Sequence, residues 1–301
     1  MKITAPCIIP DLPIEDYHSV APGLSSSQMV DLIHSPGLYY GRYVTGEYEK
    51  PDSPAFAFGN ALDWMLTSPS RFDELVAIKP VDFDGRKKEG KEWLAARANL
   101  VVISQQEKQV IDILVKKLAA KKISKKIFGA NEMQLSYFMN LNFEFAGEVK
   151  TILIKCRPDR LSKWFISDDK SDLDPSYNAF SKKIGTCNYH IKAAMYKLIT
   201  DTVDGVKRDF IFNVYGKKPP YMVKHYILKD CEIATGMEYF YRAIETLLVC
   251  QASGIWPDEV TDENWYHYKD EGEWYDFTDT ADPIERTVWQ QKNDMFGGTN
   301  D

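Results

Sequence analysis

The chain has 301 residues, of which 44% are hydrophobic and 27% are charged, and its formal net charge is −7. This composition is typical of an ordinary globular protein and excludes a disordered chain. No run of 18 apolar residues occurs, which argues against a membrane-spanning class. The net acidity also argues against general coating of nucleic acid, so any nucleic acid must meet a local basic surface.

The amino terminus has only a short apolar patch, broken by prolines and acids, unlike the core of a signal peptide. The five cysteines are widely spaced and include no C-x-x-C pair, which argues against a disulfide framework and against a zinc cluster. We therefore predict a cytoplasmic protein with reduced thiols.

Residues 1–24 are rich in proline and acids and predict a loop or a short strand. The serines at 25–27 can cap a helix that runs to about His34, where Ser35–Pro36 ends it. A second short helical turn is expected over 36–43. It carries three tyrosines, which either pack against the core or form a base-stacking platform. They are Tyr39, Tyr40 and Tyr43.

The segment 54–67 predicts a buried helix, because its large apolar residues keep helical spacing. Asp63 lies inside it, between Leu62 and Trp64. A carboxylate in such a place is costly unless it is paired, capped or bound to a cation. The alternative is that Asp63 lies on an exposed strip of the helix.

A charged helix is expected within residues 80–98, and Ser104 to Glu107 form a capping box that opens a long amphipathic helix. That helix ends in a basic run over 116–126 with six lysines. The run is either a solvated helix end that complements the helix dipole or a contact for phosphate groups. Three lysines of the preceding charged segment are further candidates for phosphate contacts: Lys87, Lys88 and Lys91.

The hydrophobic pattern then changes from helical to extended. Four strands are expected to form a meander at the centre of a sheet, over 133–139, 143–145, 152–157 and 163–168. A helical region follows over 175–201, with a possible interruption at Gly185. Strands over 209–215 and 221–228 form a hairpin through 216–220, and a last long helix spans 232–252. The tail from Trp256 is expected to be irregular, with frayed residues 297–301.

The strands predicted over 152–157 and 163–168 form a hairpin that is followed by unusual polar residues. Asp159 closes the first strand, whereas Asp168 and Lys170 close the second and share one side of the extended backbone, because they are two residues apart. Two carboxylates with a neighbouring lysine make a metal-dependent hydrolase site, in which the lysine orients a water. The alternative is that charged residues merely occupy turns, which favour aspartate.

No internal repeat and no long linker divides the chain. We therefore predict one domain over 1–301. Its amino-terminal part (1–130) is mostly helical and includes Asp63, the sheet and the catalytic residues lie in 131–252, and 253–301 is an irregular tail.

With these residues in place, the chain resembles the RecE-type exonucleases of the PD-(D/E)xK nuclease superfamily from about Asp16 to Ala252. The resemblance begins with Tyr17–His18 and the serine-rich segment over 24–40. It continues through four further motifs, of which K-C-R-P-D is the sharpest. They are Gly59–Leu66 with Asp63, Lys155–Asp159, Asp168–Ser171, and Tyr189–Tyr196. The resemblance implies an α/β restriction-endonuclease-like core, in which a central mixed sheet is flanked by helices, with a helical amino-terminal region.

The resemblance implies that Asp159 and Asp168 bind a divalent cation, that Lys170 positions the attacking water, and that the backbone carbonyl of Asp169 is a further ligand. Asp63 stands where the family usually has a histidine ligand, and a carboxylate there suits Mg²⁺ or Mn²⁺.

Two further positions depart from the family pattern. Lys192 replaces the glutamine of the family's Gln-x-x-x-Tyr helix, whose tyrosine is matched by Tyr196. We expect Lys192 or Tyr196 to hold a phosphate oxygen. If Lys192 pairs with a ligand carboxylate instead, cation affinity falls. Gln134, where relatives often carry an acid, is a milder departure.

The resemblance further implies hydrolysis of duplex DNA ends in the 5′-to-3′ direction during recombination, partnership with a single-strand annealing protein, and a ring-like homo-oligomer. A ring would reconcile the net charge of −7 with DNA binding, because lysines could face the channel while the outside stays acidic. The alternatives are a non-catalytic nuclease-fold protein that binds DNA or a recombination partner, and a structure-specific endonuclease.

Overall fold

The structure is a computed structural model that describes residues 1–49, 54–128, 132–133 and 135–260. Its α-helices are α1 Ile14–Ser19, α2 Ser26–His34, α3 Pro36–Tyr40, α4 Pro54–Thr67, α5 Phe72–Leu75, α6 Lys88–Ala95, α7 Gln105–Ala120, α8 Lys122–Phe128, α9 Tyr177–Thr186, α10 Tyr189–Val203 and α11 Asp230–Ser253. Its strands are β1 Cys7–Ile9, β2 Val76–Ile78, β3 Val101–Ile103, β4 Glu132–Met133, β5 Ser136–Phe145, β6 Glu148–Cys156, β7 Arg160–Leu161, β8 Phe165–Asp172, β9 Asp209–Gly216 and β10 Val223–Ile227.

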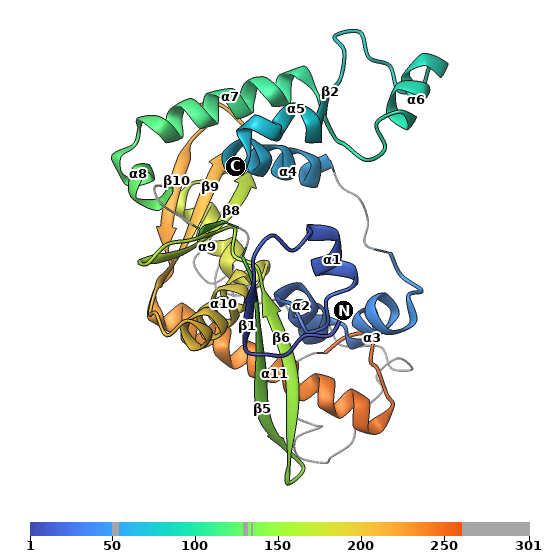
Figure 1. Cartoon of the computed structure of the whole chain (residues 1–301), viewed down its shortest axis with the longest axis vertical. Helices are drawn as coiled ribbons and strands as arrows, with labels where there is room; N and C mark the ends of the chain where they lie inside the picture. The colour runs from blue at the N-terminus through green and yellow to red at the C-terminus, as the bar shows by residue number, and fades with distance from the viewer. Residues whose placement is uncertain (50–53, 129–131, 134, 261–301) are drawn as a thin grey trace, which may run out of the picture.

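A five-stranded mixed sheet with the order β10-β9-β8-β7-β4 forms the centre of the molecule (Figure 1). β8 and β9 run parallel, while β10, β7 and β4 pair antiparallel to their neighbours. The predicted α/β class, with a mixed sheet flanked by helices, is therefore confirmed. The hairpin predicted around 216–220 is also confirmed, as β9 and β10.

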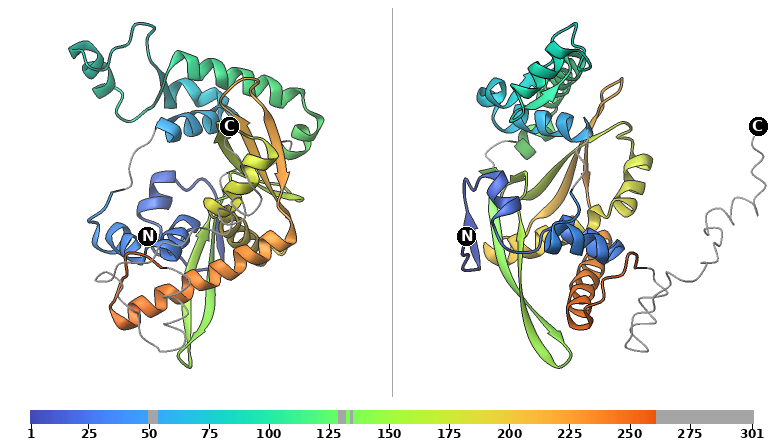
Figure 2. Two further views of the ribbon diagram at one scale, coloured as in Figure 1. Left: turned by 180° about the vertical axis from the view of Figure 1, so that it is seen from behind. Right: turned by 90° about the vertical axis from the view of Figure 1, so that its right-hand side faces the viewer.

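Both faces of this sheet are covered, as the views in Figure 2 show. Successive side chains of a strand point to opposite faces, and β9 shows this directly. Phe210, Phe212 and Val214 enter a core formed with α9, α10 and α11, whereas Tyr215 enters a second core with α4 and α7. Consequently, neighbouring residues of β8 also face different helices.

A second, antiparallel sheet has the order β1-β5-β6. β5 and β6 form a long hairpin that extends below the rest of the body in Figure 1, and its tip has positive φ angles at Ala146 (51°) and Gly147 (78°). The predicted meander at the centre of one sheet is therefore wrong. The segments predicted at 133–139 and 143–145 belong mainly to one continuous strand, β5, which pairs with β6 in this separate sheet.

The predicted hairpin between 152–157 and 163–168 is also wrong. β6 ends at Cys156 and belongs to the second sheet, while β8 belongs to the central sheet and pairs with the short strand β7. Since β7 immediately follows Asp159, the chain crosses from one sheet to the other at Arg157–Asp159. Asp168 and Lys170 lie within β8 rather than at its end, because β8 continues to Asp172.

Two helix starts are as predicted. Ser25 caps α2, with its N–H donating to the Gln28 side chain at 2.7 Å. Ser104 opens α7 with a reciprocal capping box, in which the Ser104 hydroxyl accepts from the Glu107 N–H at 3.1 Å and the Glu107 carboxylate accepts from the Ser104 N–H at 2.7 Å. The buried helix predicted at 54–67 is α4.

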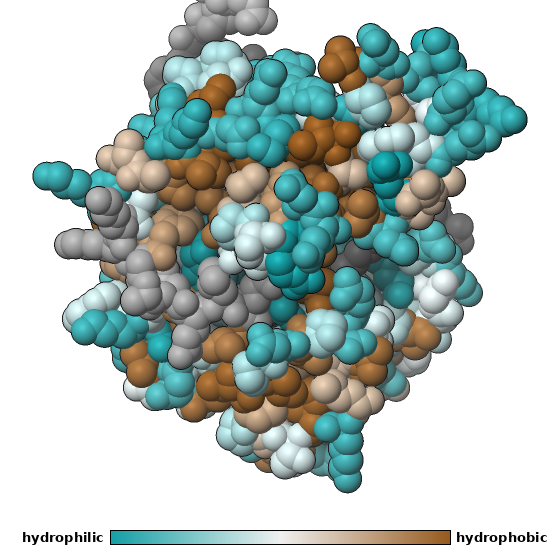
Figure 3. Space-filling model, turned by 45° about the horizontal axis from the view of Figure 1, so that its top comes forward, coloured by the Kyte–Doolittle hydropathy of each residue, from teal (hydrophilic) through white to brown (hydrophobic). Residues whose placement is uncertain are grey.

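Other boundaries differ from the predictions. Of residues 80–98, only Lys88–Ala95 is helical, and this segment projects from the body as an arm with hydrophilic side chains (Figure 3). The basic run is divided between α7 and α8 at Lys121. The interruption expected at Gly185 falls at Cys187–Asn188, where Asn188 has a φ of 51°.

Among the described residues, no helix is long and apolar enough to cross a membrane. The predictions for Gln134 and for the tail beyond residue 260 lie outside the described residues.

Candidate active site

Two lysines converge on the carboxylate of Asp168. Asp168 lies on β8 and is only 1% exposed. Lys170, two residues further along the same strand, forms an ion pair with one oxygen, and Lys192 from α10 forms an ion pair with the other. Burial alone would raise the pKa of Asp168, but the two ammonium groups outweigh burial and hold that pKa below its usual value. Asp168 is therefore an anion shared by two cations.

Lys192 is strongly held in its charged form. Burial would lower its pKa, but the charge of Asp168 outweighs burial and raises the pKa of Lys192 well above its usual value. Asp168 thus already has the Lys192 ammonium as a partner. The sequence predicts that this pairing lowers the affinity of the site for a metal ion.

Asp159 lies between the two sheets and is fixed by the backbone of β8. Its carboxylate accepts a hydrogen bond from the Asp169 N–H at 2.7 Å, and thus extends the β7–β8 ladder by one side-chain contact. Burial and the charge of Asp168 raise the pKa of Asp159 to about 6. Burial is the larger cause, and the contribution from Asp168 means that the two carboxylates repel each other.

Asp63 reaches the same region from α4, on the opposite face of the central sheet from α10. Burial, followed by the charges of Asp159 and Asp169, raises its pKa to about 7. The interpretation that Asp63 belongs to an exposed strip of its helix is therefore wrong. It faces inward, toward the other acids.

Asp169 points to the α4 face, because it alternates with Asp168 along β8. Its side chain accepts a hydrogen bond from the Asn213 amide at 2.7 Å and lies 3.5 Å from the Arg160 guanidinium. Burial raises the pKa of Asp169. These contacts anchor the Asp169 side chain. They do not test the prediction that its backbone carbonyl is a cation ligand.

A chain of hydrogen bonds extends from Asp169 toward α8. Asn213 accepts from the His225 Nδ1 at 2.8 Å, and the His225 Nε2 lies 3.2 Å from the Ser124 hydroxyl. Burial lowers the pKa of His225 to about 4, so the ring is neutral at pH 7 and accepts from Ser124 through Nε2. Asp169 is thus held in place from the outer strand of the sheet.

Tyr196 lies one turn after Lys192 on α10, and the Lys192 ammonium is 5.1 Å from the centre of its ring. Burial raises the pKa of the Tyr196 hydroxyl to about 12, so it remains a neutral donor. The predicted site residues therefore form a chain of neighbours rather than one cluster. Asp63 interacts with Asp159 and Asp169, Asp159 interacts with Asp168, and Asp168 pairs with Lys170 and with Lys192, beside which Tyr196 lies.

The chemistry of the predicted ligands suits a hard divalent cation, because carboxylate oxygens are hard donors and the Asp159 carboxylate is repelled by those of both Asp63 and Asp168. Among the described residues, no group of three or more His, Cys, Asp or Glu side chains is arranged to hold an ion. In this arrangement, both oxygens of Asp168 contact lysines, so binding an ion there requires Lys192 or Lys170 to move.

Three supporting residues were missed in the sequence: Arg160, Asn213 and Tyr215. Asn213 and Tyr215 lie on the α4 face of β9, where both side chains hydrogen-bond to Asp169. The signal that could have found Asn213 is a single amide within the apolar strand DFIFNVYG.

Two of the three tyrosines expected in the helical turn over 36–43 pack inside the protein, which was one of the two alternatives for them. Tyr39 and Tyr40 stack on Trp256, with ring centres 5.9 and 4.7 Å apart, respectively. In the basic run, Lys117 and Lys121 donate to the backbone carbonyls of Pro220 and Val223. Lys87, Lys88 and Lys91 are exposed on the projecting arm.

A family model described as "PDDEXK-like domain of unknown function (DUF3799)" matches residues 25–264. The chain belongs to this PDDEXK-like family. The match includes all of the site residues above and supports the PD-(D/E)xK superfamily, without selecting the RecE type within it. No curated protein matches the chain.

Solved structures support the same fold. A crystal structure described as "Putative exonuclease" from Eubacterium rectale shares 15% identity with the chain, with a TM-score of 0.57. The alignment covers 99% of this chain and 100% of that one. A second structure, of SSO0001, has 14% identity and a TM-score of 0.24, and it covers 62% of this chain and 84% of that one. The first similarity shows that this PDDEXK-like chain has the PD-(D/E)xK nuclease fold, and the second carries no weight.

Proposed function

We propose that this protein is a metal-dependent deoxyribonuclease that hydrolyses phosphodiester bonds at the ends of duplex DNA. The observation that carries the proposal is the cluster on β8, where Asp168 and Lys170 lie beside Asp159 in a PD-(D/E)xK fold. Asp159, Asp168 and a lysine two residues after Asp168 are the groups that this chemistry requires.

Asp63, Asp159 and Asp168 would hold Mg²⁺, with Mn²⁺ as a substitute and the Asp169 backbone carbonyl as a further ligand. The cation would supply Lewis-acid polarisation of the scissile phosphate and favour ionisation of a water. The protein's own residues do the rest. The Asp169 N–H keeps the Asp159 carboxylate oriented, and the hydrogen bonds from Asn213 and Tyr215 keep Asp169 in place.

Lys170 lies on the same strand face as Asp168 and is only partly buried, so its ammonium can turn from Asp168 toward an attacking water and orient it. Lys192 and Tyr196 project from α10 on that same face, where a cation and a neutral hydroxyl can stabilise a phosphate oxygen. In this mechanism, substrate phosphate replaces Asp168 as the partner of Lys192.

We further propose, from the resemblance to RecE-type enzymes, that digestion is exonucleolytic and runs 5′ to 3′, that it serves recombination in the cytoplasm beside a single-strand annealing protein, and that the chain forms a homo-oligomer around the duplex. The net charge of −7 does not favour DNA binding, and the exposed lysines of the α6 arm would give DNA a local basic surface to contact.

The deciding experiment measures nucleotide release from linear duplex DNA with and without Mg²⁺. Asp168→Ala and Lys170→Ala should each abolish release, whereas the matched control Lys183→Ala should retain it. Lys183 pairs with Asp172 further along β8, so this control breaks a similar ion pair outside the cluster. Substrates labelled at the 5′ or 3′ end, and covalently closed circles, separate the direction of digestion from endonuclease activity. Release that persists in both cluster variants would contradict the proposal.

One observation favours a second candidate, a nuclease-fold protein that binds DNA without cleaving it. Both oxygens of Asp168 are occupied by lysines, which opposes cation binding. In the same assay, a parent protein that releases no nucleotides but retards DNA in a gel would support this candidate.

A further inference from the structure

Strand β6 lies at the edge of the β1-β5-β6 sheet. Leu24 covers one end of its outer edge. The Leu24 N–H donates to the Leu153 carbonyl and the Leu24 carbonyl accepts from the Lys155 N–H, both at 2.9 Å. These groups of Leu153 and Lys155 therefore point away from β5. Because this direction alternates along an antiparallel pair, the N–H and C=O groups of Val149 and Thr151 also point outward.

The outer edge at Val149 and Thr151 is open in the part of the chain that the structure describes. No backbone group among the described residues pairs with the outward N–H and C=O groups of these two residues. Val149 is also 68% exposed. An open edge with an exposed apolar side chain is a template for pairing with another segment, and proteins usually cover such edges. The edge of β6 therefore favours an added strand.

A groove of about 510 Å³ lies beside this edge, between β6, α11 and the start of α2. Much of its lining is apolar and includes Leu24, Tyr39, Ile152, Leu247 and Leu248. In strand addition, the backbone of the added segment pairs with the edge, and its alternate side chains enter neighbouring pockets. The groove is placed to receive such side chains.

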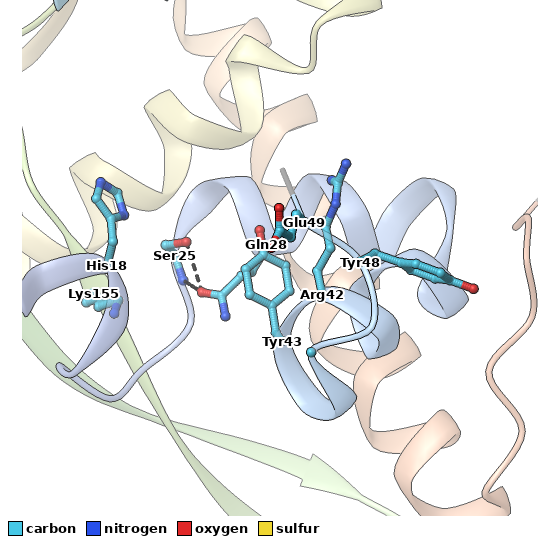
Figure 4. Close-up of a pocket in the computed structure, with 9 residues that line it drawn as sticks. His18, Ser25, Gln28, Arg42, Tyr43, Tyr48, Glu49 and Lys155 are labelled. Atoms are coloured by element: carbon cyan, nitrogen blue, oxygen red, sulfur yellow. Dashed lines mark hydrogen bonds between the residues drawn. The ribbon is translucent and has the colours of Figure 1, made fainter. Parts of the chain in front are cut away.

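One wall of the groove is fixed by the helix cap of α2. Gln28 lies between the groove and a separate cavity of about 660 Å³, which Figure 4 shows. The Gln28 side chain accepts hydrogen bonds from the Ser25 N–H at 2.7 Å and from the Ser25 hydroxyl at 2.9 Å. These contacts hold Gln28 in place, so this wall of the groove is already formed.

The described chain ends beside the groove. Trp256 stacks on Tyr39, a lining residue, with ring centres 5.9 Å apart. Val260, the last described residue, donates from its N–H to the His34 carbonyl at 2.9 Å and packs against α11. Twelve residues separate Val260 from Glu273, and an extended chain of this length spans up to about 40 Å. The segment from Glu273 onward can therefore reach the edge of β6.

The segment 273–278, Glu-Trp-Tyr-Asp-Phe-Thr, has the composition of a strand, because aromatic and β-branched residues favour strands. In an extended conformation, Tyr275 and Phe277 share one face and Trp274 takes the other. The edge of β6 has apolar side chains on both faces as well. Ile152 and the groove lie on one face, and Val149 lies on the other. The pattern of the segment thus matches that of the edge.

Charge favours the same segment. Residues 261–301 contain eleven Asp and Glu residues against three Lys and Arg residues. Of the residues that line the groove, Lys150 is the one with a charged side chain. Its ion pair with Glu148 lies at the exposed surface, where such pairs contribute little. Lys150 can therefore turn toward an acidic strand without losing a strong contact.

We propose that residues 273–278 of the same chain bind along the open edge of β6 as a fourth strand of the β1-β5-β6 sheet, with Tyr275 and Phe277 in the groove. The outward groups of Val149 and Thr151 supply the backbone hydrogen bonds. None of these residues belongs to the carboxylate cluster, so the proposed nuclease activity and this docking fail independently.

Hydrogen exchange of the full chain, followed by mass spectrometry, tests the docking. Tyr275→Ser with Phe277→Ser removes both apolar anchors, and we expect the outward amides within 148–152 to exchange about tenfold faster than in the parent. Val288→Ser with Trp289→Ser, a matched change elsewhere in the tail, is the control and should leave exchange at β6 unchanged. Equal exchange within 148–152 in the parent and in the first variant would overturn the proposal.

A cross-link shows whether the added strand comes from the same chain. Gln251→Cys with Thr278→Cys places one thiol in the lining of the groove and one at the end of the docked segment. In oxidised glutathione at low protein concentration, a disulfide within one chain should form about tenfold faster than in the control pair, Gln251→Cys with Gln290→Cys. Equal rates in the two pairs would overturn the docking. A disulfide between two chains would assign the groove to a second copy and would also overturn it.

Discussion

Lys192 is partly buried and Lys155 is buried, but their surroundings differ in a more important way. Lys192 has a carboxylate partner, Asp168, which raises the pKa of the lysine well above its usual value. Within the described residues, Lys155 donates to the carbonyls of Tyr17 and Ala21 and forms no ion pair, and burial lowers its pKa to about 8. Burial therefore opposes both charges, and the presence of a fixed anion decides which charge is stabilised.

The comparison also separates two kinds of site. At Lys192 the protein supplies its own anion, so a cation or a phosphate must displace an existing ion pair. In the part of the chain that the structure describes, Lys155 forms no ion pair, so no fixed anion stabilises its charge. We expect the largest effects on nucleotide release and stability when Asp168, the anion that two lysines share, is removed. We expect the smallest effects when only the charge of Lys155 is lost.

Removal of Asp168 should have the largest effect. Asp168→Ala deprives Lys170 and Lys192 of their common partner and removes a proposed ligand, so nucleotide release should fall at least ~10³-fold. Urea unfolding should show a loss of about 2–3 kcal/mol, below the cost for a fully buried pair because both lysines retain some exposure. Activity and stability equal to those of the parent would contradict the described cluster.

The pH dependence of stability is the next largest effect. The pKa values of Asp63 and Asp159, about 7 and 6 in the folded protein, lie above their unfolded value of 3.8. The folded state therefore binds more protons between pH 4 and 7, and stability contributed by these groups is lost as the pH rises through that range. For the metal-free protein we expect a fall on the order of 2 kcal/mol across this range.

Asp63→Asn should reduce this fall, because the amide does not titrate. The control is Asp73→Asn, which changes an exposed aspartate on α5 and should leave the slope unchanged. Unfolding in urea at several pH values, in EDTA, measures the slope. An equal slope in the parent and in Asp63→Asn would show that Asp63 lies outside the cluster.

Lys192→Gln tests directly whether Lys192 competes with a metal ion for Asp168. It restores the glutamine of the RecE-type pattern and frees one oxygen of Asp168, so Mn²⁺ should bind about tenfold more tightly by titration calorimetry. Lys183→Gln, which frees Asp172 in the same way, is the matched control and should leave Mn²⁺ affinity unchanged. Unchanged affinity in Lys192→Gln would mean that the lysine does not compete with the ion.

Lys155→Met should have the smallest effect on stability. Since the folded pKa of Lys155 lies below its unfolded value of 10.5, the unfolded state binds more protons between pH 8 and 10.5, and stability from this group rises with pH in that range. The variant should lose this rise, by less than about 1 kcal/mol. Melting curves at pH 7.5 and 10 measure this rise in stability, with Lys150→Met as the control. If stability rises as much in Lys155→Met as in the parent, another group is responsible for the rise.

Much of this molecule could be predicted from local sequence. The buried helix that contains Asp63, the capping box at Ser104 and the β9–β10 hairpin depend on nearby residues, and each was predicted close to its position. The candidate site residues could be named from the sequence because Asp159, Asp168 and Lys170 fall in one short segment and because Asp63 interrupts an apolar helix. The resemblance gave roles to Lys192 and Tyr196.

The remaining features depend on contacts between distant segments. Nothing local shows that β6 and β8 belong to different sheets, because strand pairing is decided by partners such as β5 and β9. The arm around α6 was predicted as a longer helix, since its charged residues favour helix without specifying its length. Lys155 belongs to a motif in the sequence, and only the fold shows that it is buried and that, among the described residues, no carboxylate pairs with it.

The central claim is that Asp63, Asp159 and Asp168 surround a divalent cation, and crystals soaked in Mn²⁺ test it most directly. We predict an anomalous scattering peak bounded by these three carboxylates, with the Lys192 ammonium moved away from Asp168. A fully soaked crystal with no peak at this position, in which Lys192 still pairs with Asp168, would contradict the claim.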